Sequence, residues 1–163
     1  MENILEQAIR NNDIEYIKQS IDDGTHIDNI MRLVMEYDAL QIMIDLYSDD
    51  YIDFSKMFDP DLFNIIIKNN SFAILSYLKE NKELIGDNCD EDCVTILDTD
   101  YDVYFRDAIN KNNTYIIDIL CDIFFTEEVC TESSEEVISL IEYAIDVGKP
   151  KSGRFLYNYL MYL

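Results

Sequence analysis

The chain of 163 residues has the length of one ordinary domain, and an apolar share of 48% is enough to build a core. Its 34 acidic residues against 12 basic ones give a net charge of −22. This disfavours direct binding to nucleic acid or to an anionic membrane surface, because both need clustered Lys and Arg. With only four Gly and two Pro, helices are favoured over a β-fold rich in tight turns.

Residues 4–24 predict two short antiparallel helices joined by a polar turn. Apolar side chains recur at helical spacing over residues 4–10. The Asn-Asn-Asp sequence at 11–13 then interrupts the helix, because these side chains compete for backbone hydrogen bonds. Asp13 can cap a second helix, which is expected to end at Gly24, a residue favoured just after a helix.

The same pattern returns four more times along the chain. Each copy has an apolar anchor on its first helix and a turn position four residues later. The anchors are Ala8, Val34, Ile66, Ala108 and Ala144, and the turn positions are Asn12, Asp38, Asn70, Asn112 and Gly148. The anchors are separated by 26, 32, 42 and 36 residues, a mean of 34. This period predicts an all-α helical-repeat solenoid of about five helix pairs. A non-repetitive helical bundle is the alternative.

The first pair resembles an ankyrin repeat. Ala8-Ile9 stands where that family has its Ala-Ala pair, Asn12-Asp13 replaces the Gly-His turn, Tyr16-Ile17 replaces the paired valines, and Gly24 takes the place of the closing glycine. No pair has the Thr-Pro-Leu-His opening of the family. The resemblance implies a single ankyrin-like helical domain over residues 1–163 that acts as a scaffold for protein interactions.

The composition adds a second resemblance. A chain rich in Ile, Asn, Asp and Tyr and poor in Gly is similar in style to the degenerate ankyrin proteins of large DNA viruses, poxviruses or giant viruses. That likeness implies a viral protein that engages a host factor.

The 42-residue gap between the third and fourth anchors holds an acidic loop insertion at about 84–102. Tyrosines among carboxylates suit a partner rich in Arg and Lys, because Arg can stack on the ring while it pairs with the acid. The candidate partner-binding residues are Asp90, Glu91, Asp92, Asp98, Asp100, Tyr101 and Asp102 at the insertion, and Tyr37, Asp49, Asp50 and Tyr51 elsewhere. The alternative is that the acidity only keeps the fold soluble.

The sequence predicts no metal site, no cofactor and no catalytic centre. Cys89 and Cys93 lack two further ligands with the spacing of a structural zinc site. The spaced aspartates of the insertion imitate a calcium loop, but Val103 stands where that loop has its glycine. A histidine-dependent nucleophile would have to use His26, the single histidine of the chain.

We therefore expect a non-enzymatic module that binds a basic protein partner. The charge of −22 could instead mimic the phosphates of DNA and occupy the groove of a nucleic-acid-binding protein. No signal peptide or membrane-spanning run is visible, so a cytoplasmic or nuclear location is expected. The apolar C-terminal residues 155–163 predict self-association, or docking of the tail onto the last helix pair.

Overall fold

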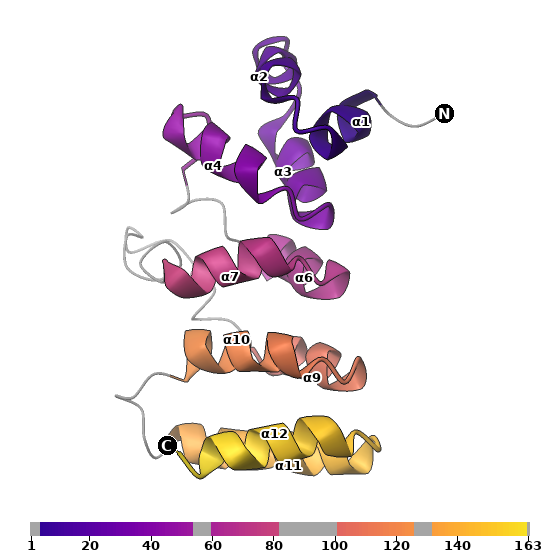
Figure 1. The fold of residues 1–163 in the computed structure, drawn as a ribbon, viewed down its shortest axis with the longest axis vertical. Helices are drawn as coiled ribbons and strands as arrows, with labels where there is room; N and C mark the ends of the chain where they lie inside the picture. Colours follow the sequence, from indigo (N-terminus) through magenta and orange to yellow (C-terminus); the bar gives the residue numbers. More distant parts are fainter. Residues whose placement is uncertain (1–3, 54–59, 82–100, 126–131, 163) are drawn as a thin grey trace. The chain divides into compact units, whose positions relative to one another are not determined.

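The computed structural model describes residues 4–53, 60–81, 101–125 and 132–162. Every secondary-structure element in these ranges is an α-helix, which confirms the all-α prediction (Figure 1). The chain divides into two compact units, Met1–Ile96 and Leu97–Leu163. Residues 84–100 of the predicted acidic insertion lie outside the described ranges.

The described residues of the first unit form three helix pairs. Its helices are α1 (Ile4–Arg10), α2 (Ile14–Asp22), α3 (Ile27–Glu36), α4 (Leu40–Ser48), α6 (Pro60–Asn69) and α7 (Phe72–Glu80). Each first helix packs on its own second helix, and the first helices also pack on one another, α1 on α3 and α3 on α6. The second helices α2 and α4 are likewise in contact.

In the part of the second unit that the structure describes there are two helix pairs. Its helices are α9 (Asp102–Asn110), α10 (Thr114–Phe124), α11 (Glu132–Asp146) and α12 (Pro150–Leu160). Here α9 contacts α10 and α11, while α12 contacts α10 and α11. First helix therefore lies on first helix and second on second, as in the first unit (Figure 1).

All five predicted turn positions adopt the same left-handed backbone conformation, with φ between 54° and 69°. In each turn the anchor carbonyl accepts a hydrogen bond from the N–H five residues later, at 2.7–3.0 Å. A second bond runs from the N–H of the turn residue to the carbonyl after the anchor, at 2.8–3.4 Å. Together these bonds form a Schellman motif, which closes a helix C-terminus. Asn, Asp and Gly occupy these positions because they tolerate left-handed φ better than other residues.

The residue after each turn position is the N-cap of the second helix. Asp13 caps α2 as predicted, because its Oδ1 accepts a hydrogen bond from the N–H of Tyr16 at 3.2 Å. Asn113 caps α10 in the same way, through the N–H of Ile116 at 3.3 Å. Gly24 follows α2 with φ 98°, so its predicted role after the helix is also confirmed.

The anchors lie in the core. Ala8 is 6% exposed and the other four anchors are fully buried. The described residues thus contain the five predicted helix pairs, each with the same turn and a buried anchor at the equivalent position.

Candidate functional site

Side chains at the turns connect one helix pair to the next. The Asp38 carboxylate accepts hydrogen bonds from the backbone N–H groups of Ala73 at 2.9 Å and Ile74 at 3.0 Å. These groups belong to the first turn of α7, where the helix dipole favours a negative charge. The buried Ser71 hydroxyl also donates to the carbonyl of Met35. The turn of the second pair therefore caps the second helix of the third pair.

The second unit makes the same link with different groups. The hydroxyl of Ser152, fully buried in α12, donates to Oδ1 of Asn112 at 3.0 Å. Asn112 is a turn position, as Asp38 is. Ser152 lies eight residues after its anchor, as Ile74 does. Equivalent positions thus meet in both units although their side chains differ.

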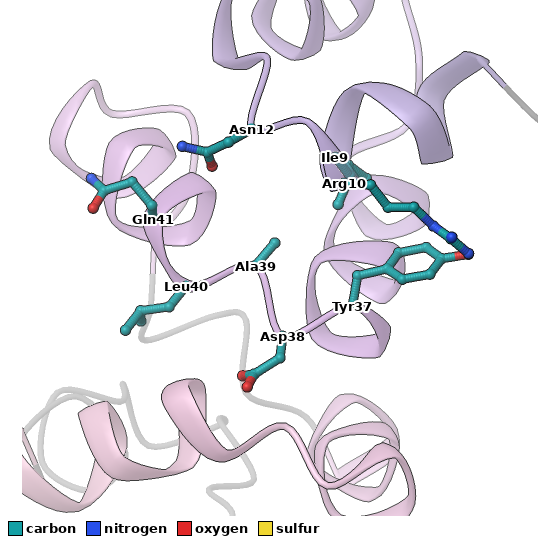
Figure 2. Close-up of a pocket in the computed structure, with 8 residues that line it drawn as sticks. All are labelled: Ile9, Arg10, Asn12, Tyr37, Asp38, Ala39, Leu40 and Gln41. Atoms are coloured by element: carbon teal, nitrogen blue, oxygen red, sulfur yellow. The ribbon is translucent and has the colours of Figure 1, made fainter.

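Between the first and second pairs the surface is open instead. A recess of about 740 Å³ lies at the turns of these pairs (Figure 2). Its lining residues are Ile9, Arg10, Asn12, Tyr37, Asp38, Ala39, Leu40 and Gln41. In Figure 2, Asn12 and Gln41 lie on one side and Arg10 and Tyr37 on the other.

Tyr37 was predicted to offer its ring to a partner's Arg, but the chain's own Arg10 stacks on it. The guanidinium carbon lies 4.6 Å from the ring centroid, and Arg10 donates to the Tyr37 hydroxyl at 3.3 Å. The second unit repeats this contact, since the guanidinium of Arg106 lies 4.3 Å from the ring centroid of Tyr143. Both contacts join the first helices of successive pairs, so these stacks contribute to the packing of the pairs.

Asp49, Asp50 and Tyr51 lie at the other end of α4. The helix has nine residues, so about 13 Å separates them from the recess. Lys18 of α2 forms an ion pair with Asp49, and this hydrogen bond raises the pKa of the Lys18 ammonium. Asp50 has φ 60°, and the N–H of Tyr51 donates to the carbonyl of Leu46 at 2.9 Å. Asp50 therefore closes α4 as the turn positions close the first helices.

Carboxylates occur at the C-terminal ends of both α2 and α4, and we call these residues the acidic end. It consists of Asp22, Asp23, Asp49 and Asp50, all exposed. The two helices contact each other, and neither has a basic residue in its last turn. A carboxylate at a helix C-terminus is unfavourable by roughly 0.3–1 kcal/mol, because the carbonyl end of the helix dipole is negative.

Comparison of the chain with protein-family models, with curated proteins and with solved structures finds no match. The ankyrin-like interpretation therefore depends on the internal repetition of the chain.

Two candidate residues at the edge of the insertion lie in the second unit. The ring of Tyr101 packs against Phe124 and Phe125, with centroids 5.1 and 5.8 Å apart. Asp102 forms an ion pair with Arg106, one helical turn later. Tyr101 is thus half-buried in an aromatic cluster rather than fully open to solvent. The remaining candidates, Asp90, Glu91, Asp92, Asp98 and Asp100, lie outside the described residues.

Tyr159, near the end of α12, contacts the preceding helix pair rather than the last one. The Tyr159 hydroxyl donates to the carbonyls of Phe125 at 3.2 Å and Cys121 at 3.4 Å, at the end of α10. Burial raises the pKa of Tyr159 to about 12, and burial also raises the pKa of the buried Cys121 thiol. Met161 and Tyr162 remain exposed.

The described residues also bear on metal binding and on membrane insertion. No three His, Cys, Asp or Glu side chains within these ranges come together as a metal would require. Nor is any helix among them both long enough and apolar enough to span a bilayer.

Proposed function

We propose that this chain is a non-enzymatic, ankyrin-like protein-interaction module that binds a basic protein partner at the acidic end of α2 and α4. The observation that carries the proposal is the set of exposed carboxylates at the C-termini of two helices that contact each other, without a basic residue in the last turn of either helix. Lys or Arg side chains of a partner would complement both the carboxylates and the helix dipoles.

The charge balance around this surface supports a cationic partner. Residues 4–53 contain 12 acidic and 3 basic side chains. Two of the basic ones are engaged within the chain, Arg10 with Tyr37 and Lys18 with Asp49. Repulsion among the carboxylates weakens the free protein, and a basic partner would relieve it on docking. Association should therefore be fast and sensitive to salt.

Tyrosines beside the acidic end suit the same partner. Tyr47 lies in the last turn of α4 and is exposed, and Tyr51 follows Asp50 directly. An aromatic ring next to a carboxylate gives an Arg both a stacking face and an ion pair. The Lys18–Asp49 ion pair and the packing of α2 on α4 hold the two helices that present these groups, which lowers the entropy lost on binding.

The proposal is tested by neutralising the acidic end without disturbing the fold. The variant Asp22→Asn/Asp23→Asn/Asp50→Asn keeps the Asp49 pair, and Asn at position 50 tolerates the left-handed turn. A control variant with the same change in charge carries Glu36→Gln/Asp61→Asn/Glu80→Gln, at exposed positions outside the acidic end.

Wild type and both variants are used to capture proteins from a cell lysate at low salt. We expect a basic protein that the wild type and the control retain and the acidic-end variant loses. Association rates of that protein, measured by surface plasmon resonance at two salt concentrations, should fall at least tenfold for the acidic-end variant. Equal rates for the two variants would show that only the overall charge matters, and would refute the assigned surface.

A further inference from the structure

The last helix pair exposes a residue that every earlier pair buries. The residue directly after the anchor is Ile9, Met35, Ile67 or Ile109 in the first four pairs, and each is at most 2% exposed. In the last pair it is Ile145, which is 66% exposed. Ile138 lies two helical turns earlier on the same side of α11 and is 45% exposed.

The second helix of this pair differs in a similar way from that of the preceding pair. Tyr157 of α12 lies 13 residues after its anchor and is 53% exposed. The equivalent residue of the preceding pair is Cys121, which is fully buried. In that pair Ile109 and Cys121 belong to α9 and α10, against which α11 and α12 pack (Figure 1). The fourth pair thus shows what covers such a face, namely another helix pair. We call the uncovered face of the last pair, with Ile138, Ile145 and Tyr157, the terminal face.

The charges around the terminal face are divided between its two helices. Residues 132–146, which form α11, contain five acids and no base, and residues 147–163 contain three bases and no acid. Helical spacing places the exposed Glu142 between Ile138 and Ile145. It places the exposed Arg154 one turn before Tyr157 on α12. On α11 the face therefore has Glu142 between two isoleucines, which we call the acidic stripe. On α12 it has Arg154 beside Tyr157, which we call the basic stripe.

We propose that the terminal face binds the same face of a second copy of this chain, in a two-fold symmetric dimer. A two-fold axis brings α11 of one copy against α12 of the other, so that the acidic stripe meets the basic stripe twice. The isoleucines and tyrosines between the charges are removed from water in the same contact. This inference is independent of the proposed function, because the acidic end lies in the first unit.

Sedimentation velocity on the full chain tests the apolar part of the inference. Wild type should show a monomer–dimer equilibrium over ~1–100 µM, the range of a modest interface. Ile138→Ser/Ile145→Ser should weaken dimerisation at least tenfold, with an unchanged far-UV circular dichroism spectrum. Val103→Ser replaces an apolar residue of α9 that is 53% exposed, and should leave the equilibrium unchanged. Dimerisation that survives in the isoleucine variant would overturn the inference.

A charge exchange tests the symmetry. Glu142→Arg alone and Arg154→Glu alone should each weaken dimerisation at least tenfold, because each creates two repulsive contacts in its homodimer. An equimolar mixture of these two variants should dimerise as wild type does, because both contacts of the mixed dimer join opposite charges. Failure of the mixture to dimerise would overturn the inference. So would wild type that is monomeric at ~100 µM or that forms open-ended polymers.

Discussion

Replacing Asp38 by alanine should lower the free energy of unfolding by about 1.5–4 kcal/mol, through two separable causes. The Asp38 carboxylate accepts hydrogen bonds from two N–H groups at the start of α7, at 2.9 and 3.0 Å. Loss of such a helix cap costs about 0.5–2 kcal/mol. The residue also has φ 54°, a left-handed conformation that costs alanine about 1–2 kcal/mol.

Three further variants separate these causes. Asp38→Gly removes the cap but suits the left-handed turn, so we expect a loss near the capping value alone, about 0.5–2 kcal/mol. Asp38→Asn keeps the turn and one acceptor oxygen, and should lose less than about 1 kcal/mol. Asn12→Ala is the matched control, because Asn12 has φ 56° but borders the recess instead of capping the next pair.

The assay is urea denaturation followed by far-UV circular dichroism, with slopes compared to confirm that the unfolded states are alike. The Asp38→Ala variant should lose more free energy of unfolding than the Asn12→Ala variant, and the difference should equal the contribution of the cap, about 0.5–2 kcal/mol. Equal losses would refute the capping role. A glycine variant at position 38 that is more stable than wild type would refute it as well.

Three other positions give independent tests. Ser152→Ala should cost about 1 kcal/mol in the same assay, because Oδ1 of Asn112 loses a buried donor. Gly148 has φ 69°, so Gly148→Ala should cost about 1–2 kcal/mol, whereas Gly148→Asn should be close to neutral; equal effects would argue against a conformational cause. The pKa of Tyr159 is raised from 10 to about 12, so the folded state favours the neutral phenol. This contribution is complete below pH 10 and is lost as the pH rises toward 12. The difference in melting temperature between wild type and Tyr159→Phe should therefore shrink over that window, and a constant difference would contradict the assignment.

The features that could be predicted from sequence are local ones. The turn positions were predicted because Asn, Asp and Gly favour left-handed backbone, and their distance from the anchors is fixed by the helix. The anchors were predicted because apolar residues recur at helical spacing on one face of each first helix. Both sets depend on residues fewer than ten positions apart, so no knowledge of tertiary packing was needed.

The partners of the candidate site residues were not predicted. Arg10 and Tyr37 are 27 positions apart, and Lys18 and Asp49 are 31 apart. Such contacts depend on how one helix pair is aligned with the next, which the pattern within a pair does not specify. The burial of Tyr101 has the same cause, because Phe124 and Phe125 reach it from another helix. The terminal face was foreseen only in part, since the prediction concerned residues 155–163 and not Ile138 or Ile145.

The choice of residue at the turns also affects the unfolded chain. Four of the five left-handed turn positions hold Asn or Asp where glycine would be free of strain. Glycine explores more backbone conformations when unfolded, so Asn and Asp lose less backbone entropy on folding, which offsets the strain that they bear in the left-handed turn. With Asn and Asp at these turns, the unfolded chain has fewer backbone conformations to lose when the helix pairs form. The folded chain carries a net charge of −22, and repulsion among these charges opposes folding. A smaller entropy loss on folding offsets part of that repulsion.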